Sequence, residues 1–383
     1  MSKPYRVVVW GPGAMGSGCL RELIRRPEFE VAGVLAYSAS KNGKDVGELI
    51  GHAPIGVKVT TDQKAILAMD ADCVIWCGAM PTTLEKAAEM ENEIIAILES
   101  GKNVVTPVAY HYAYSPSHEP EYIQRVEAAC RKGKSSIHGT GENPGFWFER
   151  VALTLTGVCN DVEYIKLEEY ADCSGMNGKD VLNAIGFGVL PEQAKGFATV
   201  LSQIWQRYHF AETLNFVSKS LYGRHLDRID FEPEYHVSDR DYVFEKAKGD
   251  PIDFTISKGQ VRAMTYHFRG YLDGKFRLED SVNWFLTPGT SPFTGKVDSQ
   301  WDFEIEGKPT SLQCTVRALA SVKNHMEFWP NDPTSPTWYA TIAPMIQAIP
   351  LVCAAEPGVV LATAFASAVP DLRTLATRKS LVN

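Results

Sequence analysis

The chain has 383 residues, of which 45% are hydrophobic and 22% charged, and its formal net charge is −8. This composition is typical of a folded protein of at least two domains, and it excludes wholesale disorder, collagen-like fibres and repeats of charged helices. The acidic balance argues against nucleic acid as a partner, because a protein that grips phosphates needs a basic face. No apolar run of about 18 residues is present, so no membrane span is expected.

The eight cysteines are spread singly along the chain and form no CxxC pair. The N-terminus enters a strand-like run directly and has no signal-peptide pattern. Together these features predict reduced thiols in a cytoplasmic protein. The histidines lack the short spacing of a metal motif such as HExxH, so no metal site is predicted.

Apolar runs alternate with helical stretches from Tyr5 to about Arg150. Strands are expected at 5–10, 30–37, 72–78 and 102–108, and helices at 16–26, 83–100 and 121–133. Continuous apolar runs are typical of strands that are buried on both faces, and the helices between them imply crossover connections. We therefore predict an α/β fold in which residues 1–150 form a Rossmann domain with a doubly wound parallel sheet.

Beyond Arg150 the pattern changes. Residues 161–170, 260–284 and 301–321 have β character, with a hairpin turn signal at Asp273-Gly274, whereas residues 192–222 have helical character. We predict a second, β-rich α+β domain over residues 151–335, which binds the substrate and forms the oligomer interface. The apolar segment at residues 336–383 is expected to be mostly helical and to pack back on the first domain. A homodimer is expected because an exposed sheet face needs covering.

A glycine-rich loop follows the first predicted strand and opens the first predicted helix. It consists of Gly11, Pro12, Gly13, Ala14, Met15 and Gly16. In such a GxGxxG loop the first glycine makes the tight turn, the second admits the pyrophosphate and the third allows close packing of helix on strand. The helix N-terminus supplies free N–H groups to the phosphates. A glycine-rich turn without a ligand is the alternative, but the alternating elements that follow favour a dinucleotide site.

The end of the second predicted strand indicates which dinucleotide is bound. NAD enzymes usually place a carboxylate there, about 20 residues after the glycine loop, to hold the ribose 2′-hydroxyl. This chain instead has Tyr37, Ser38, Ser40, Lys41 and Lys44, with no carboxylate before Asp45. Hydroxyls and a lysine suit a 2′-phosphate, so NADP is the predicted cofactor. NAD remains possible if this segment is an ordinary solvated loop.

Several motifs together resemble the dihydrodipicolinate reductase N-terminal superfamily. They are GPGAMG, DVGELIG, GKNVVTP and HGTGENPGF, and the likeness continues through GDPIDFTISKGQVRAMTYHFRG and IPLVCAAEPGV. Within the superfamily the sequence is most similar to the branch of 2,4-diaminopentanoate dehydrogenases and native amine dehydrogenases. The resemblance implies an NAD(P)-dependent oxidoreductase whose substrate lies between the two domains.

The resemblance also implies which residues line the site. Cys77, Gly78, Ala79, Thr106, Pro107 and Asn143 are expected at the cofactor, and Val108, Thr140, Phe146 and Trp147 at the substrate. Two family features are missing. The His-His and Lys signature of dihydrodipicolinate reductases is absent, so that activity is not expected. The catalytic glutamate of the amine dehydrogenases would fall on Val108, and valine cannot exchange a proton.

Four residues are candidates for catalysis or for binding of the substrate. Glu142 lies in the predicted pocket loop, where apolar surroundings would raise its pKa and make it an acid near neutral pH. Tyr110 could donate a phenolic proton, and His267 could face the pocket from a strand. Glu169, next to Glu168 at a strand end, could point into the cleft. The alternatives are a solvent-facing loop glutamate, a packing tyrosine, a core histidine and a solvated charge, respectively.

We predict hydride transfer between the nicotinamide and the carbon of a C=O or C=N bond in a small organic substrate. One alternative is an amine dehydrogenase whose acid/base group has moved, for example to Glu142. A second alternative is an NADP-binding sensor or subunit without catalysis.

Overall fold

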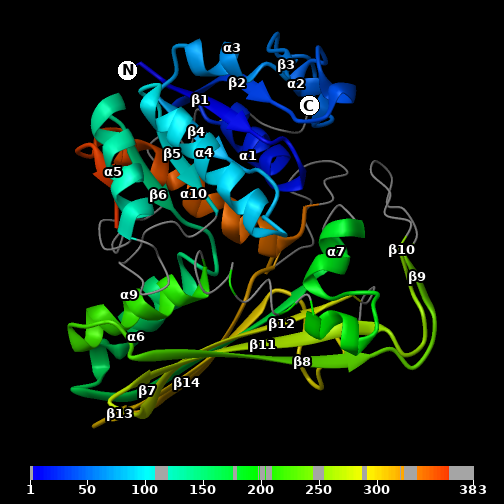
Figure 1. The fold of residues 1–383 in the computed structure, drawn as a ribbon, viewed down its shortest axis with the longest axis vertical. Coiled ribbons are helices and arrows are strands. Elements are labelled where there is room, and N and C mark those ends of the chain that lie inside the picture. The colour runs from blue at the N-terminus through cyan, green and yellow to red at the C-terminus, as the bar shows by residue number, and fades with distance from the viewer. Residues whose placement is uncertain are drawn as a thin grey trace.

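The structure is a computed structural model in which two layered bodies lie one above the other (Figure 1). It describes residues 3–107, 120–175, 179–196, 198, 203, 209–244, 254–286, 291–319, 321–322 and 334–361. The upper body is a sheet between helices, and the lower body is a second sheet with helices on the side that faces the upper body.

The first sheet has seven strands in the order β15-β6-β5-β4-β1-β2-β3, and every pair is parallel. The strands are β1 (Tyr5–Trp10), β2 (Phe29–Leu35), β3 (Val59–Thr60), β4 (Cys73–Trp76), β5 (Asn103–Thr106), β6 (Ser136–Gly139) and β15 (Gly358–Val359). Strand β1 lies near the centre, and its residues from Val7 to Trp10 are buried. The continuous apolar runs of the sequence are therefore strands that are covered on both faces.

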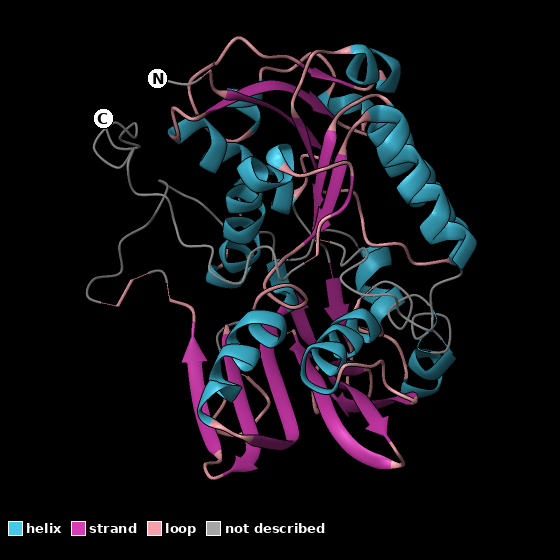
Figure 2. Ribbon diagram, turned by 90° about the vertical axis from the view of Figure 1, so that its left-hand side faces the viewer, coloured by secondary structure: helices cyan, strands magenta, loops and turns pink. Residues whose placement is uncertain are grey.

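Helices cover both faces of this sheet (Figures 1 and 2). On one face, Val7 and Val9 pack with residues of α1 (Ala14–Arg25) and α10 (Pro336–Ala354). On the other, Val8 and Trp10 pack with residues of α4 (Leu84–Glu99) and α5 (Pro120–Gly133). The shorter helices α2 (Val46–Leu49) and α3 (Gln63–Ala68) follow β2 and β3. The predicted doubly wound parallel sheet is thus confirmed.

Helix α10 joins the first body although it comes near the end of the chain. It packs against α1, β4, β5 and β6, and β15 then adds a strand next to β6. Its 19 residues have a mean hydropathy of 1.3, which is enough to cross a membrane by length and composition. However, all of its residues except Leu351 and Ala354 are buried or half-buried in the fold, and Pro344 and Pro350 lie inside it. These contacts make α10 a core helix of the first body.

The second sheet has six strands in the order β14-β13-β7-β12-β11-β8. They are β7 (Asp161–Asp172), β8 (Arg228–Val237), β11 (Val261–Leu272), β12 (Lys275–Phe285), β13 (Gln300–Lys308) and β14 (Leu312–Arg317), and all pairs are antiparallel except β7 with β12. Asp273 and Gly274 form the turn between β11 and β12 with φ of 52° and 70°, as a tight hairpin requires. A short pair, β9 (Tyr242–Phe244) with β10 (Phe254–Ile256), lies beside this sheet.

Helices α7 (Lys179–Ile185) and α9 (Phe210–Tyr222) belong to the second body, and α9 packs on β11 and β12. The Phe210 ring stacks on Phe268 of β11 with centroids 4.5 Å apart. The predicted helical character of residues 192–222 is confirmed where the structure describes them: residues 191–196, 198 and 203 are helical, and after His209 helix α9 begins at Phe210. The predicted β-rich second domain is confirmed in type, while the domain limits at residues 150 and 335 stay predictions.

Candidate active site

A cavity of about 500 Å³ lies between the first sheet and the inner face of the second. Loops that follow β1, β2, β4, β5 and β6 form one side of it, at the edge where doubly wound sheets bind their ligands. The opposite wall is formed by Glu169, Ala171, Asp172, Cys173, Ile185, His209, Phe210 and Trp284, and Thr337, Trp338 and Thr341 of α10 complete it. One half of the cleft therefore carries a glycine loop, and the other half is apolar and acidic.

The glycine-rich loop has the geometry of a pyrophosphate site. Gly11 has φ of +95°, and a Cβ there would lie 2.5 Å from the carbonyl oxygen of Cys77. A Cβ on Gly16 would overlap the carbonyl oxygen of Gly11, so this glycine lets α1 pack close to β1. A Cβ on Gly13, by contrast, would meet no atom within 4 Å. The space above Gly13 is therefore open for a ligand, and a side chain would fill it.

The N-terminus of α1 is also suited to bind an anion. No side chain caps this helix, whose N-cap is Gly13, and Pro12, Ala14 and Met15 line the cavity. Uncapped N–H groups at a helix N-terminus bind phosphate well because they combine free donors with partial positive charge. These residues fit the diphosphate of a dinucleotide.

The loop after β2 carries the residues predicted to read the ribose. Ser38 and Lys41 line the cavity, and Ser40 is bonded to Ser38 through their hydroxyls at 2.8 Å. The Lys41 Nζ donates to the carbonyl oxygen of Pro12 at 2.8 Å, so this lysine bridges the β2 loop and the glycine loop. A hydroxyl pair and an ammonium group next to the glycine loop are suitable ligands for a phosphate on the ribose.

A pair of buried carboxyl groups from the two sides of the cleft meets at the cavity. Glu142 and Glu169 are only 6% and 3% exposed, both line the cavity, and their carboxyl groups lie close enough to share a hydrogen bond. Burial raises the pKa of Glu142 well above its usual value, and the charge of Glu169 raises it further. Burial also raises the pKa of Glu169, but hydrogen bonds from Trp284, Asn143 and Trp301 oppose this rise.

The two carboxyls therefore have different protonation preferences. Trp284 donates to one oxygen of Glu169 at 2.8 Å and Trp301 to the other at 3.4 Å, which favours the ionised form of Glu169. The Oε2 of Glu142 has no hydrogen-bond partner in the structure. Of the two, Glu142 has the pKa that is raised further, so Glu142 is the carboxyl that keeps a proton more readily.

Two further buried acids lie behind this pair. Asp280 accepts from the Asn143 amide at 3.2 Å, and burial raises its pKa well above the usual value. Glu149 accepts from the Thr213 hydroxyl at 2.7 Å and from the Gly145 N–H at 2.9 Å. Neither acid lines the cavity. Asp280 supports the position of Asn143, and Glu149 ties residues 142–146 to α9.

The structure brings most of the predicted cofactor residues to one cavity. The predicted cofactor residues that line the cavity are Gly11 to Met15, Ser38, Lys41, Cys77, Gly78, Ala79, Pro107 and Asn143. The predicted Glu142 and Glu169 line it as well. The predicted site residues that do not line the cavity are Gly16, Ser40, Thr106, Thr140, Phe146 and Trp147. Several of these support the wall: the Trp147 ring stacks on Trp301 at 4.5 Å, and the Thr140 hydroxyl accepts from Arg150 at 3.4 Å. Val108 and Tyr110 lie outside the residues that the structure describes.

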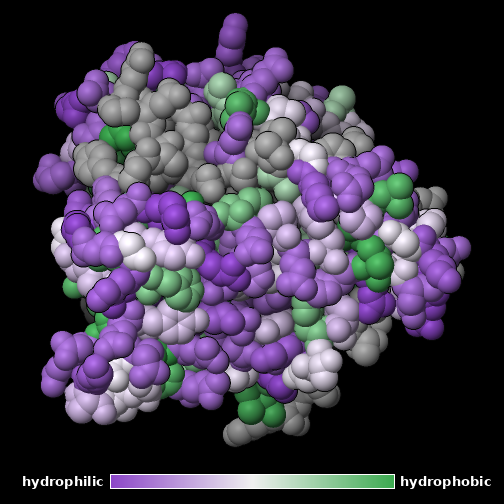
Figure 3. Space-filling model, turned by 60° about the horizontal axis from the view of Figure 1, so that its bottom comes forward, coloured by the Kyte–Doolittle hydropathy of each residue, from purple (hydrophilic) through white to green (hydrophobic). Residues whose placement is uncertain are grey.

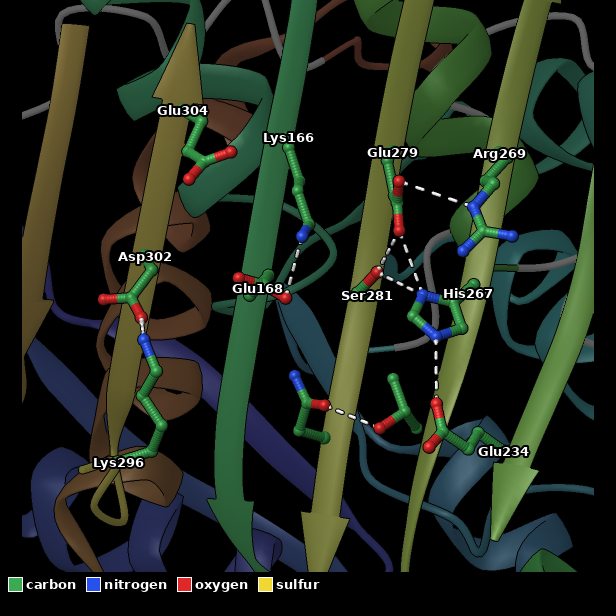
Figure 4. A network of polar contacts seen from close by, with 12 residues as sticks. Lys166, Glu168, Glu234, His267, Arg269, Glu279, Ser281, Lys296, Asp302 and Glu304 are labelled. Atoms are coloured by element: carbon green, nitrogen blue, oxygen red, sulfur yellow. Dashed lines mark hydrogen bonds and ion pairs between the residues drawn. The ribbon is translucent and has the colours of Figure 1, made fainter. Parts of the chain in front are cut away.

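The structure does not bring His267 to the cleft, which corrects the prediction for this residue. Its neighbours Tyr266 and Phe268 on β11 are fully buried in the core, so the alternation along the strand turns His267 to the opposite, outer face of the sheet. There Nδ1 lies 2.9 Å from Glu279 and Nε2 lies 3.9 Å from Glu234, within a network of charged side chains (Figure 4). The strand prediction was right, but the sequence did not reveal which face is the inner one.

Further residues complete the wall. Tyr37 and Met80 lie on the nucleotide side, in the segments after β2 and β4 that were predicted from the sequence to contact the ribose. His209, Thr337, Trp338 and Thr341 lie on the substrate side and were not predicted. Burial lowers the pKa of His209 to about 4, so this histidine is neutral at physiological pH.

The parallel sheet, the open glycine loop and the cleft closed by a second sheet define a two-domain nicotinamide-nucleotide oxidoreductase. Residues 5–97 match the family model described as dihydrodipicolinate reductase, N-terminus. The chain is 25% identical to the 2,4-diaminopentanoate dehydrogenase of Acetoanaerobium sticklandii over 369 residues, which cover 92% of this chain and 91% of that protein.

A second relative is the amine dehydrogenase of Streptomyces virginiae, with 29% identity over 184 residues. That match covers 47% of this chain and 50% of the length of the Streptomyces protein. The solved structure of an amine dehydrogenase from Mycobacterium smegmatis has the same fold, with a TM-score of 0.75 at 21% identity over 97% of this chain and 98% of that one. These matches confirm the predicted resemblance and the predicted class, an NAD(P)-dependent dehydrogenase or reductase.

Proposed function

We propose that this protein is an NADP-dependent dehydrogenase that acts on a carbon–nitrogen bond. It would interconvert a small, largely apolar amine with the corresponding ketone or aldehyde and ammonia. The observation that carries the proposal is the buried pair Glu142 and Glu169 in the cleft, in which Glu142 comes from the loop after β6 and Glu169 from β7 of the opposite wall. The names of the two curated relatives, amine dehydrogenase and 2,4-diaminopentanoate dehydrogenase, support the same chemistry.

The charge of the pair favours nitrogen over oxygen at the reacting carbon. An ionised carboxylate in an apolar cleft is costly unless a cation pairs with it. Glu169 is 3% exposed, and among the described residues that line the cavity Lys41, on the far loop, is the one lysine or arginine. An ammonium or iminium group of the substrate would supply the missing positive charge, whereas a neutral carbonyl would not.

Glu142 would act as the acid and base. When NADPH is bound, its nicotinamide supplies the hydride. In the direction of amination, ammonia adds to the carbonyl, and protonated Glu142 gives its proton to the hydroxyl that leaves as water. Glu169 then stabilises the positive iminium carbon–nitrogen bond that accepts the hydride. The sum is ketone, ammonium and NADPH giving amine, NADP⁺ and water.

The remaining wall residues indicate the chemical character of the group attached to the reacting carbon. Phe210, Trp284 and Trp338 present aromatic surface, Ile185 adds an aliphatic side chain, and His209 is neutral. Aromatic surfaces of this kind bind apolar groups and exclude water from a reacting hydride. The proposed substrate is thus an alkyl or aryl amine rather than a sugar.

NADP rather than NAD is proposed from the β2 loop. Lys41, Ser38 and Ser40 replace the carboxylate that would repel a 2′-phosphate. The Lys41 ammonium group, 2.8 Å from the Pro12 carbonyl, needs only a small movement to reach a phosphate beside the glycine loop.

An ammonia titration tests the proposed function. Purified protein is mixed with NADPH and a panel of small apolar ketones and aldehydes, and NADPH oxidation is followed at increasing ammonium concentration. The proposal expects a rate that rises and saturates with ammonium. A rate independent of ammonium would identify carbonyl reduction instead, and tight NADPH binding without any turnover would identify a sensor or subunit.

The proposed homodimer and the cytoplasmic location stay separate predictions. The outer face of the second sheet is hydrophilic, as the face that comes forward in Figure 3 illustrates and as the charged network of Figure 4 explains. Such a face can be solvated without a partner, so the need to cover apolar surface does not itself demand a dimer. Light scattering at several protein concentrations decides the oligomeric state. All eight cysteines are free thiols, as a reducing compartment would keep them.

A further inference from the structure

Tyr37 occupies the position at the end of β2 where a ribose-binding acid is common in dinucleotide sites. Its side chain lines the cavity next to Ser38, and it is 55% exposed although Val34, Leu35 and Ala36 before it are buried. A large aromatic side chain that is half exposed inside a cleft offers a flat apolar surface to a ligand.

The Tyr37 ring is held by its hydroxyl. The Trp10 indole donates to this oxygen at 2.9 Å, and the hydroxyl donates to Glu93 Oε2 at 2.6 Å. Glu93, which belongs to α4, also accepts from the Trp76 indole at 3.2 Å and from Gln63 at 3.1 Å. The ring is thereby tied to β1, β4 and α4 at once, and its orientation is set before any ligand arrives.

The same hydrogen bonds determine whether the Glu93 carboxylate can bind a ribose hydroxyl. Its two oxygens already accept three hydrogen bonds from Tyr37, Trp76 and Gln63. This carboxylate is therefore occupied by protein donors, and it does not take the place of the acid that would bind a ribose 2′-hydroxyl. What remains for the adenosine end of a dinucleotide is the Tyr37 ring, with Ser38 and Lys41 next to it.

We propose that Tyr37 is the platform on which the adenine ring of the cofactor stacks, and that Glu93 is the residue that positions this platform. The inference rests on the proposed nicotinamide-dinucleotide function and assigns its adenosine subsite. Aromatic stacking does not distinguish NADP from NAD, because both carry adenine. Tyr37 and Glu93 would thus set the affinity for the cofactor, and Ser38 and Lys41 would set its selectivity.

Titration calorimetry with NADP⁺ and with NAD⁺ tests the proposal on the wild type and on the variants Tyr37→Ala, Tyr37→Phe and Glu93→Gln. Tyr37→Ala is expected to raise the dissociation constant of both dinucleotides about tenfold, the order expected for loss of one base–aromatic stack. Tyr37→Phe and Glu93→Gln keep the ring but release it, and each is expected to raise both constants about threefold, a typical loss for one positioning hydrogen bond.

The matched control is Glu89→Gln, which removes an exposed carboxylate one turn earlier on α4. Reduced nicotinamide mononucleotide, which lacks adenosine, is the second control, and its KM should be the same in every variant. If Tyr37→Ala binds both dinucleotides like the wild type, the platform is refuted. If Glu93→Gln behaves like Glu89→Gln, the positioning role is refuted. A wild type that binds neither dinucleotide would contradict the proposed function itself, and if Tyr37→Ala fails to fold, Tyr37→Phe and Glu93→Gln decide the matter.

Discussion

Replacing Glu142 with glutamine tests the acid/base role most sharply. The substitution keeps the shape of the side chain and removes the exchangeable proton. Glu142 is 6% exposed and its Oε2 accepts no hydrogen bond in the structure, so an amide costs the fold little. Thermal unfolding should therefore show a melting temperature at least equal to that of the wild type.

The magnitude follows from the chemistry of the step. A positioned general acid contributes about 10²–10⁴ in rate, which corresponds to about 3–5 kcal/mol of transition-state stabilisation. Glu142→Gln is therefore expected to lower kcat for reductive amination about a thousandfold. The KM for NADPH should stay within about twofold, because Glu142 is not among the residues proposed to hold the cofactor.

The pH dependence gives an independent check. Burial and the charge of Glu169 raise the pKa of Glu142, so the proton donor is present at neutral pH and is lost as the pH rises through this raised value. The wild-type rate of amination should fall on the alkaline side, and in Glu142→Gln this alkaline decline should disappear. The assay is steady-state NADPH oxidation from pH 6 to 10 at saturating ammonia.

Glu149→Gln is the matched control. Glu149 is equally buried and close in sequence, but it does not line the cavity and it accepts bonds from Thr213 and Gly145. This variant should lose about 1–3 kcal/mol of stability and keep the pH profile of the remaining activity. A Glu142→Gln enzyme with a wild-type rate and the same alkaline decline would refute the assignment of Glu142.

Three further predictions follow from the same structure. Gly13→Val should abolish dinucleotide binding in calorimetry, because a Cβ at this position meets no protein atom within 4 Å and the side chain extends from it into the space open for the ligand. Gly16→Ala should instead lower the melting temperature, because its Cβ overlaps the Gly11 carbonyl. Lys41→Ala should raise the dissociation constant of NADP⁺ about tenfold, as expected for loss of one charge-assisted bond to phosphate, and should change the dissociation constant of NAD⁺ by no more than about twofold. Lys44→Ala, at an exposed lysine, is the control. An equal loss of affinity for both dinucleotides in Lys41→Ala would contradict NADP selectivity. Burial alone would raise the pKa of Glu279, but hydrogen bonds from His267 and Ser281 and the charges of Arg269 and Lys166 hold it at about 2. The contribution of ionised Glu279 to stability is therefore present above the ordinary pKa of 4.5 and is lost as the pH falls through about 2. Glu279→Gln should lower the free energy of unfolding by about 1–2 kcal/mol at pH 7 after allowance for solvent screening. In urea denaturation, the difference between wild type and variant should shrink towards pH 2.

The nucleotide half of the fold could be predicted from the sequence because local rules determine it. A buried strand, a glycine loop and a helix follow one another within residues 5–25, so Gly11, Gly13 and the uncapped start of α1 were identifiable before any contact was known. Lys41 and Ser38 followed from their distance along the chain.

The substrate half depends on contacts between distant segments, and these could not be predicted. Glu169 reaches the cleft only because β7 lies between β12 and β13, and its ionised form is favoured by indoles from residues 284 and 301. His267 has the same alternating pattern as Glu169, yet it points to the other face. Trp338 joins the wall because α10 returns to the first sheet. Alternation along a strand reveals two faces, and only the packing shows which one is inside.

The most direct test of the central claim follows two labelled atoms into one product. The protein is incubated with a small apolar ketone, ¹⁵N-ammonium and NADPH deuterated at the nicotinamide C4 position, and the products are analysed by mass spectrometry. We predict a primary amine that carries ¹⁵N and deuterium on the same carbon, and we predict that Glu142→Gln forms it about a thousandfold more slowly. A deuterated alcohol without ¹⁵N would contradict carbon–nitrogen chemistry in this cleft.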